Sequence, residues 1–254
     1  MNGGTTPLDC VASVVLYRDP PERIENLISD LFDTRLKVKL CIVDNSPAPV
    51  PITPGDRPIL YHHAGRNLGY GKANNWSITN GGPSRYFLIL NPDVSLSGGV
   101  LEALAQYMDG HPEVGAVCPK ILNGDGTLQP LNKRHPTVLD LFLRRFCAGS
   151  ALPCVRKRLD RYEMRDVGYD DIREVPFMTG AFMFCRTRVL REVGGFDPRY
   201  FMYFEDADLS RKIQNAGFKT VYYPHVQITH LWKRESRKRL AMALVFLISG
   251  MKYF

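Results

Sequence analysis

Short apolar runs alternate with amphipathic stretches through the first half of the chain. Residues 11–17 form a β-branched run of the kind found in buried strands. In residues 21–32 four apolar side chains recur at helical spacing, and Asp19 is placed to cap that helix. Strands separated by helices predict right-handed crossovers and a mostly parallel sheet. The same patterns predict strands at 39–43, 59–62 and 85–90 and helices at 72–79 and 98–108.

The second half of the chain is less regular. Residues 116–122 and 219–223 are predicted strands, and residues 123–126 (NGDG) form a predicted hairpin turn. A helix over 205–216 is expected to end at Gly217, and glycines also follow a short predicted helix at 188–193. A last helix is expected over 236–254. The whole pattern predicts an α/β protein with a central sheet flanked by helices and a helical segment at the C-terminus.

Three of the predicted strands end in polar side chains, at residues 17–19, 44–46 and 91–93. The carboxyl ends of parallel strands meet at one edge of a sheet, and ligands bind beyond that edge. We therefore expect these three segments to form one rim that binds a ligand.

Composition excludes several classes of protein. The chain has 254 residues, of which 44% are apolar and 23% charged, as in ordinary globular proteins and unlike disordered chains, collagens or coiled coils. No apolar run is long enough to span a bilayer, and the N-terminus shows no secretory signal. The cysteines lack CxxC spacing and are expected to be reduced thiols of a cytosolic protein: Cys10, Cys41, Cys118, Cys147, Cys154 and Cys185.

Positive charge is concentrated in the second half of the chain. The net charge is +7, but residues 1–127 carry 10 Lys/Arg against 13 Asp/Glu, whereas residues 128–254 carry 23 against 13. A basic half suits an anionic partner such as nucleic acid, a phosphorylated substrate or an anionic membrane. A solvated basic surface explains the same charge equally well.

Few single residues point to chemistry by themselves. Asp93 at a strand end can hold a divalent cation and, through it, two phosphates, or it can cap the following turn. Glu205-Asp206 suits the first turn of a helix, but it follows an aromatic run in which burial would raise a carboxyl pKa, as a general base requires. His230 lies past the strand predicted at 219–223, and a lone histidine is more often structural.

The loop at residues 67–71 (NLGYG) places glycines before a helix. It matches neither GxGxxG nor GxxxxGK[ST], so no dinucleotide fold or P-loop is predicted. Glycines there still allow a ligand to approach the backbone closely. The basic run at 233–239 is either a solvated face or a site for diphosphate or membrane.

Taken in order, these pieces resemble the family 2 inverting glycosyltransferases with the GT-A fold, over residues 12–236. The stretches that carry the resemblance are VASVVLYRDP, CIVDNS, NLGYGKANNWSI, YFLILNPDV, the block from VPFMTGAFMFCR to IQNAGFK, and ITHLWKRES. The long block looks most like the bacterial rhamnosyltransferases that build O-antigen, lipopolysaccharide and other surface polysaccharides. The resemblance implies a Rossmann-like GT-A domain over 1–235, with a nucleotide-sugar half at 1–127, an acceptor half at 128–235 and a C-terminal amphipathic helix at 236–254.

The resemblance also implies a donor site. Tyr17 and Asp44 would line the nucleotide pocket, with Asp44 accepting a hydrogen bond from the pyrimidine base. Lys233, Arg234 and Ser236 would face the diphosphate. The other implied substrate contacts are Asn67, Gly69, Lys72, Asn75, Asn91, Thr179 and Gly180.

The implied catalytic and metal residues lie further along the chain. Asp206 of the Glu205-Asp206 pair would be the general base. Asp93 matches the last carboxylate of the DxD motif and, with His230, would hold Mg²⁺ or Mn²⁺. Asn91 stands where the first Asp of that motif often lies, so metal affinity is expected to be modest. If the donor is dTDP-β-L-rhamnose, inversion gives an α linkage; another UDP- or GDP-sugar is the alternative.

The expected partners follow from two basic and apolar stretches, at 139–161 and 240–250, which are too short to span a bilayer. They predict peripheral attachment to the cytoplasmic face of the bacterial inner membrane and a saccharide or polyprenyl-linked acceptor, although core packing explains such stretches about as well. A homodimer through the C-terminal helix and a non-catalytic membrane scaffold are further alternatives. No nucleic acid partner is expected, because no RRM or helix-turn-helix pattern appears.

Overall fold

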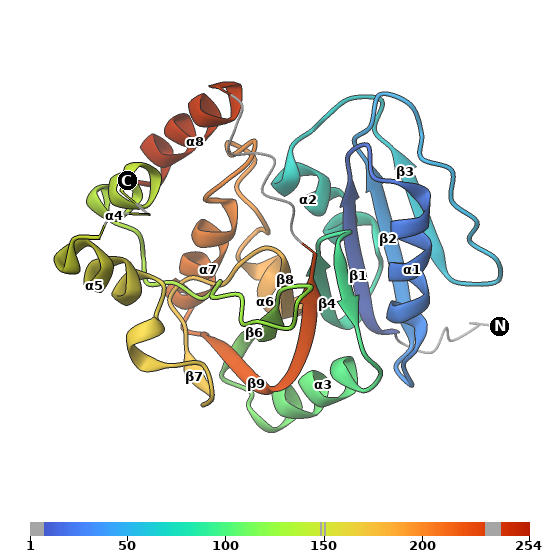
Figure 1. The fold of residues 1–254 in the computed structure, drawn as a ribbon. Helices are drawn as coiled ribbons and strands as arrows, with labels where there is room; N and C mark the ends of the chain where they lie inside the picture. The colour runs from blue at the N-terminus through green and yellow to red at the C-terminus, as the bar shows by residue number, and fades with distance from the viewer. Residues whose placement is uncertain (1–7, 148, 150, 232–239) are drawn as a thin grey trace.

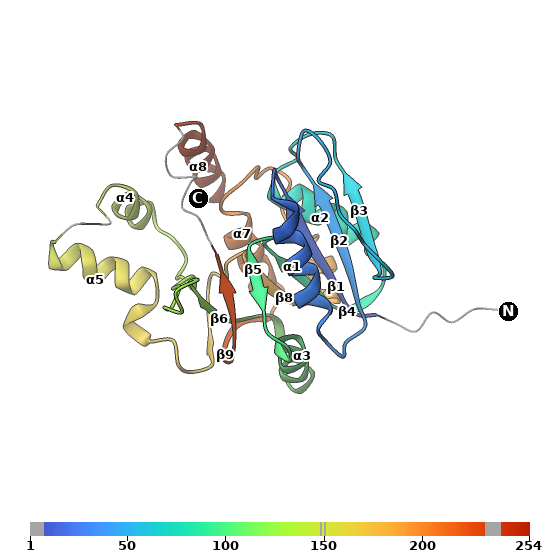
Figure 2. The same ribbon diagram turned by 45° about the vertical axis from the view of Figure 1, so that its right-hand side comes forward.

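One sheet of nine strands runs through the molecule, with helices on both faces (Figures 1 and 2). The computed structural model describes residues 8–147, 149, 151–231 and 240–254. The strand order is β3-β2-β1-β4-β8-β6-β9-β5, and β7 also pairs with β9. The strands are β1 (Leu8–Leu16), β2 (Val38–Asp44), β3 (Ile59–His63), β4 (Ser84–Leu90), β5 (Val94–Leu96), β6 (Val114–Leu122), β7 (Arg173–Glu174), β8 (Phe182–Arg186) and β9 (Lys219–His230).

The parallel arrangement predicted for the first half is confirmed. β3, β2, β1 and β4 are neighbours and all run parallel. The second half makes the sheet mixed, because β8 lies antiparallel between β4 and β6, and β5 and β7 run antiparallel to β9. The carboxyl ends of β1, β2 and β4 therefore share one edge.

Alternation along the strands divides the core into two layers. In β1 the side chains of Ala12, Val14 and Leu16 pack on one face of the sheet, and Val11 packs on the other. The first face is covered by α1 (Pro21–Phe32) and α3 (Val100–Gly110), and the second by α2 (Tyr70–Asn80), α6 (Thr187–Glu192) and α7 (Glu205–Asn215).

A smaller helical group lies beside the sheet, away from the N-terminus (Figure 1). It contains α4 (Val138–Phe146), α5 (Pro153–Tyr162), the short helix Arg165–Val167 and α8 (Leu240–Tyr253). Thr137 and Asp140 form a reciprocal capping box at the start of α4. In the part of the chain that the structure describes, no helix is long and apolar enough to cross a membrane.

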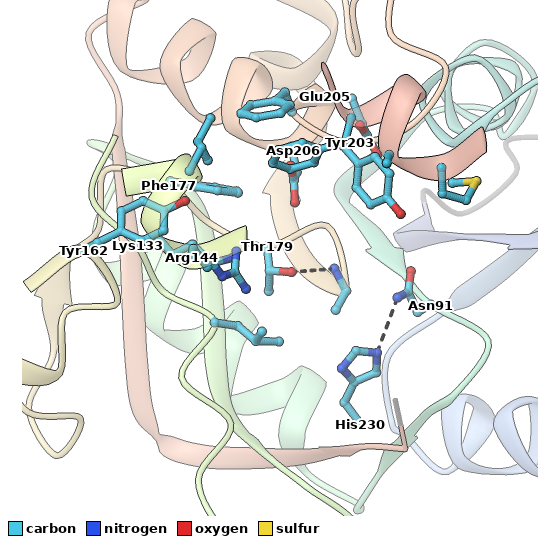
Figure 3. Close-up of a pocket in the computed structure, with 17 residues that line it drawn as sticks. Asn91, Lys133, Arg144, Tyr162, Phe177, Thr179, Tyr203, Glu205, Asp206 and His230 are labelled. Atoms are coloured by element: carbon cyan, nitrogen blue, oxygen red, sulfur yellow. Dashed lines mark hydrogen bonds between the residues drawn. The ribbon is translucent and has the colours of Figure 1, made fainter. Parts of the chain in front are cut away.

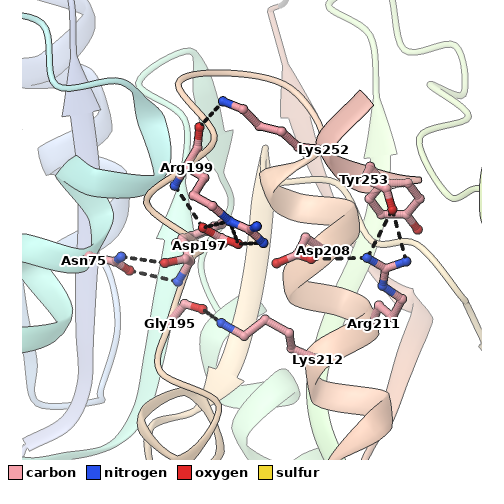
Figure 4. Close-up of polar contacts among 10 residues, drawn as sticks. Asn75, Gly195, Asp197, Arg199, Asp208, Arg211, Lys212, Lys252 and Tyr253 are labelled. Atoms are coloured by element: carbon pink, nitrogen blue, oxygen red, sulfur yellow. Dashed lines mark hydrogen bonds and ion pairs between the residues drawn. The ribbon is translucent and has the colours of Figure 1, made fainter. Parts of the chain in front are cut away.

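Polar contacts tie α8 and the loop before α7 to the rest of the fold (Figure 4). Arg211 on α7 donates to the carbonyl of Tyr253 at 3.4 Å, and Lys252 donates to the carbonyl of Arg199 at 2.6 Å. Lys212 donates to the carbonyl of Gly195 at 2.6 Å. The C-terminal helix is therefore fixed against the elements that carry the acidic pair.

Two local predictions are wrong. Asp19 does not cap α1, since its carboxylate accepts from the Tyr17 N–H and pairs with Arg23 at 2.8 Å, and Pro20 takes the cap position. The last strand does not end at 223, because the register shift opposite Pro119 and Lys120 accommodates Pro224 and the strand continues to His230.

Candidate active site

The ends of β1 and β2 are in contact, and β4 ends beside β1 in the same parallel set, as the sequence predicted. The backbone N–H of Arg18 donates to Ser46 Oγ at 2.8 Å, and the N–H of Asn45 donates to the Leu16 carbonyl at 2.9 Å. Tyr17 is 47% exposed at this rim. The segments after β1 and β2 therefore form one continuous surface at the edge where parallel sheets bind ligands.

Asp44 is buried at the end of β2 and holds the loop that follows it. Its carboxylate accepts from the N–H of Ser46 at 2.8 Å, the N–H of Val50 at 2.7 Å and the hydroxyl of Tyr61 at 2.6 Å. Burial alone would raise the pKa of Asp44, but these hydrogen bonds outweigh it and hold the pKa below its usual value. Asp44 is thus an ionised acceptor at the rim, and its contact with a base stays a prediction.

The loop before α2 is shaped by close packing. Asn67 Oδ1 accepts from the N–H of Gly69 at 2.9 Å. Gly69 has φ +83°, and a Cβ there would collide with the carbonyl of Phe201. Lys72 lies exposed in the first turn of α2. Only glycine allows the loop before α7 to approach α2 this closely.

Asn75 is occupied by the protein itself. Its Nδ2 donates to the Phe196 carbonyl at 2.7 Å, and its Oδ1 accepts from the Phe196 N–H at 2.8 Å (Figure 4). The amide clamps the loop before α7 to α2. This geometry gives Asn75 a structural role, while its predicted substrate contact remains untested.

Asp93 and His230 lie together at the far end of the rim. The Nε2 atom of His230 is 3.2 Å from Oδ1 of Asp93, because β5 and β9 pair with Val94 opposite His230. The side chain of Asn91 approaches the same Nε2 at 3.4 Å. Burial would raise the pKa of Asp93, but the hydrogen bond and charge of His230 lower it.

The residues at this point suit a divalent cation. Two ligands about 2.1 Å from one octahedral cation lie about 3 Å apart, close to the Asp93–His230 separation. Nδ1 of His230 is 2.7 Å from Oε1 of Gln129, which leaves Nε2 directed at Asp93. Among the described residues no group of three His, Cys, Asp or Glu side chains could hold a metal. A cation here would need further ligands from phosphate and water, which Mg²⁺ commonly takes.

The acidic pair begins α7. Oδ2 of Asp206 accepts from the N–H of Gly180 at 3.0 Å, and Oδ1 accepts from the N–H of Ala207 at 2.9 Å. Burial raises the pKa of Asp206, and the charge of Lys133 opposes that rise. The carboxyl of Glu205 is also buried, and burial together with the charge of Asp206 raises its pKa well above the usual value. Asp206 is thus the better ionised base and Glu205 its neutral neighbour.

The backbone before the pair is strained. Tyr203 and Phe204 both have positive φ, at +70° and +67°. Such conformations are uncommon for bulky residues and gather at functional sites. Thr179 lines the same cavity, and a Cβ on Gly180 would lie 3.4 Å from Cβ of Asp206. The strain fixes where the two carboxyl groups point.

One cavity of about 370 Å³ joins these groups. In Figure 3, Asn91 and His230 lie on one side of Asp206, and Lys133, Arg144 and Tyr162 lie on the other. The remaining lining side chains are Leu131, Leu141, Phe177, Thr179, Ala181, Tyr203, Phe204, Glu205, Met242, Ala243 and Phe246.

Sequence reasoning missed four of these site residues: Gln129, Lys133, Arg144 and Tyr162. The predicted turn at 123–126 was the available signal, because it sends the chain back along β6, where the Gln129 N–H donates to the Ile121 carbonyl at 2.8 Å. The predicted diphosphate contacts Lys233, Arg234 and Ser236 lie outside the described residues.

Comparison with known proteins identifies relatives over most of the chain. The family model described as "Glycosyltransferase like family 2" matches residues 64–244. The chain is 28% identical over 243 residues to an N-acetylglucosaminyl-diphospho-decaprenol L-rhamnosyltransferase of Mycobacterium tuberculosis, covering 87% of this chain and 76% of the relative. It is 23% identical to the rhamnosyltransferase WbbL of Escherichia coli K12, covering 91% and 86%.

Several solved structures share the fold at low identity. They include GalNAc-T7 with UDP, GalNAc and Mn²⁺ (TM-score 0.65, 13% identity, 90% of this chain), and TarS of S. aureus (TM-score 0.61, 12%, 90%). A third is the mannosyltransferase PcManGT of Pyrobaculum calidifontis with GDP-Man and Mn²⁺ (TM-score 0.58, 15%, 91%). The chain spans 44%, 37% and 59% of these three chains, respectively.

Proposed function

The chain belongs to the family 2-like glycosyltransferases, and from that premise we propose that it transfers L-rhamnose from dTDP-β-L-rhamnose to a lipid-linked saccharide, with inversion. The family and the GT-A fold predicted from the sequence are confirmed, and so is the assignment as a glycosyltransferase. The observation that carries the proposal is that one cavity contains both the Asp206 carboxylate and His230, the partner of Asp93.

The chemistry follows from the positions of these groups. Asp206, held by the Gly180 N–H, would take the proton from the acceptor hydroxyl as that oxygen attacks the anomeric carbon. Attack from the face opposite the leaving nucleotide inverts the configuration and makes an α linkage from a β donor. Glu205, neutral beside Asp206, adds no second negative charge to repel the donor.

The donor would lie along the rim. Asp44 would accept from the base beside Tyr17, and the loop with Asn67, Gly69 and Lys72 would flank the nucleotide. A divalent cation, Mg²⁺ or Mn²⁺, held between Asp93 and His230 would stabilise the charge on the departing diphosphate. Lys233, Arg234 and Ser236 would add to that stabilisation. Because residue 91 is an asparagine, Asp93 would be the single carboxylate ligand of this cation, so the affinity for the metal would be modest.

Rhamnose is proposed because the relatives named above are rhamnosyltransferases. The relative of M. tuberculosis is named for an acceptor on a diphospho-decaprenol carrier, which supports a polyprenyl-linked acceptor in the synthesis of O-antigen, lipopolysaccharide or another surface polysaccharide. Another UDP- or GDP-sugar is the alternative donor, since two structural neighbours were solved with UDP and with GDP-Man.

Membrane contact is proposed from exposed apolar side chains on two neighbouring helices. On α4 these are Val138 and Leu139, and on α8 they include Leu244, Leu247 and Met251, which is 74% exposed. Both helices contribute side chains to the cavity wall. This face would bring the enzyme to the cytoplasmic side of the bacterial inner membrane, next to a lipid-linked acceptor. A homodimer through α8 would use the same face.

A donor screen tests the proposal. The protein would be offered dTDP-rhamnose and a panel of UDP- and GDP-sugars with Mg²⁺ or Mn²⁺, with and without membrane lipid extract, and released nucleoside diphosphate would be measured. We expect metal-dependent release from dTDP-rhamnose that rises with lipid extract. Release of nucleoside diphosphate from a different donor alone would identify that donor's sugar, in place of rhamnose, as the one transferred. A non-catalytic scaffold would bind donor but release no more nucleotide than Asp206→Asn does.

A further inference from the structure

Lys133 is a buried cation without an ionic partner in the described part of the chain. The residue is 6% exposed and lines the cavity together with Phe177. Its ammonium is 4.6 Å from the centre of the Phe177 ring, and the two backbones are paired at 3.2 and 3.0 Å. No described carboxylate lies within ion-pair distance of it. The backbone bridge to Phe177 thus holds a charged group against the cavity wall.

Such an arrangement is costly unless something in the cavity offsets it. A buried ammonium loses its hydration, and a ring face replaces only part of that loss. Burial accordingly lowers the pKa of Lys133 to about 7. The neighbouring Arg144 is 3.6 Å from Glu163 and also lines the cavity, so it too is only loosely paired. Two positive groups therefore share one wall, and among the described residues Lys133 forms no ion pair, although the charges of Asp206 and Glu163 act on it.

The order of side chains along the cavity indicates what these cations meet. Asn91 and His230 lie at one side, Asp206 follows, and Lys133 and Arg144 lie beyond Asp206 (Figure 3). Apolar side chains from α4 and α8 also line this cavity: Leu141, Met242, Ala243 and Phe246. A molecule that fits this cavity has an anionic group for the cations and a hydrocarbon chain for the apolar lining.

We propose that Lys133, with Arg144, forms an anion subsite for the diphosphate of the acceptor lipid. The inference rests on the proposed function, because it places the acceptor hydroxyl at Asp206. The diphosphate of the donor belongs at Asp93 and His230, on the other side of Asp206, so Lys133 is free to hold a second anion. The sugar ring of the acceptor would span the distance from Asp206 to Lys133, and the polyprenyl chain would continue along α4 and α8.

Binding of farnesyl diphosphate tests the subsite without requiring turnover. The full chain would first be saturated with dTDP and Mg²⁺ to fill the donor side, and then titrated calorimetrically with farnesyl diphosphate and, separately, with farnesol and inorganic pyrophosphate. We expect farnesyl diphosphate to bind at least about tenfold more tightly than farnesol, and Lys133→Gln to remove that advantage. Lys133→Arg should keep most of it.

Two controls separate the subsite from trivial effects. Lys157→Gln removes an exposed lysine of α5 outside the cavity and should leave binding unchanged. Circular dichroism and melting temperature show whether Lys133→Gln folds, and Lys133→Met provides a second variant of similar volume. Equal affinity of wild type and folded Lys133→Gln for farnesyl diphosphate overturns the proposal. If dTDP abolishes the binding of farnesyl diphosphate, the anion occupies the donor side, and this outcome also overturns the proposal.

Kinetics distinguish this subsite from an effect on the base. With a diphospholipid-linked sugar as acceptor, Lys133→Gln should raise KM at least about tenfold, whereas with a neutral alkyl glycoside of the same sugar KM should not change. An equal loss on both acceptors would mean that Lys133 acts only through Asp206, against the proposal. If wild type transfers no sugar at all, the proposed function fails while the binding experiment still decides the subsite.

Discussion

The Nε2 atom of His230 lies 3.2 Å from Oδ1 of Asp93, at the junction of β9 and β5. The antiparallel pairing of these two strands sets His230 opposite Val94. It therefore brings the last residue of β9 next to the segment that follows β4. Oε1 of Gln129 accepts from Nδ1 of the same imidazole at 2.7 Å. The pair depends on the long β9, because a strand ending at 223 would not carry His230 to Asp93.

The hydrogen bond that Oε1 of Gln129 accepts from Nδ1 of His230 is expected to support metal binding. Gln129→Ala should weaken Mn²⁺ affinity about 10- to 100-fold, because His230 then loses the partner that orients its ring. Mn²⁺ titration followed by electron paramagnetic resonance, with dTDP present, measures this directly. Asp93→Ala should abolish Mn²⁺ binding. Unchanged Mn²⁺ affinity in both variants would mean that the metal does not bind at Asp93 and His230.

Asp206 and Glu205 are expected to differ sharply despite being neighbours. Asp206→Asn should lower kcat about 10²- to 10⁴-fold with donor Kd unchanged, because it removes the base and keeps the shape. Glu205→Gln should cost far less, since burial and the charge of Asp206 already keep Glu205 protonated. Single-turnover transfer and donor calorimetry check both. A larger loss of kcat in Glu205→Gln than in Asp206→Asn would make Glu205 the base and Asp206 its neighbour.

Asn75 is expected to act through stability. Asn75→Ala leaves the N–H and carbonyl of Phe196 unpaired, so the free energy of unfolding should fall by about 1–3 kcal/mol. Urea denaturation measures the fall, and donor affinity of the folded variant shows whether Asn75 also binds substrate. Thr79→Ala, on the same helix, is a control because, among the described residues, its hydroxyl donates only to the Asn75 carbonyl at 3.0 Å.

These cases show how far the sequence alone could reach. The rim at 17–19, 44–46 and 91–93 was predictable, because strand periodicity and the parallel rule bring strand ends together. The position of Lys133 in the cavity wall was not predictable. It depends on the backbone bridge to Phe177, a contact between distant segments that no local pattern encodes. Asp19 was wrongly predicted to cap α1, because its two carboxylate oxygens are taken by the Tyr17 N–H and by Arg23.

The charge of Lys133 is expected to make stability depend on pH. Burial and the charge of Arg144 lower its pKa to about 7, against the opposing charges of Asp206 and Glu163. Between pH 7 and the usual lysine pKa of about 10.4 the unfolded chain binds one more proton at this residue than the folded chain. The contribution of Lys133 to stability therefore rises with pH across that window. Lys133→Met should raise the melting temperature more near pH 7 than near pH 10.

The pH dependence of binding runs the other way. Above pH 7 a growing share of Lys133 is neutral, so the affinity for farnesyl diphosphate should fall in wild type. The affinity for farnesol should stay flat, and Lys133→Arg should extend tight binding to higher pH because arginine remains charged. Calorimetry from pH 6 to 9 in buffers of matched ionic strength checks this. Parallel profiles for wild type and Lys133→Met would contradict the assignment.

The exposed face of α8 is expected to control access to the lipid. Leu247 and Met251 are 62% and 74% exposed and lie one helical turn apart. Replacing both with Asp should reduce binding to anionic vesicles by removing apolar area and adding repulsion. Transfer to a water-soluble glycoside should persist, because neither residue lines the cavity. Co-sedimentation with vesicles at low salt measures the first and product formation the second. If the double variant binds vesicles like wild type but changes its sedimentation coefficient, the face joins two copies of the chain instead.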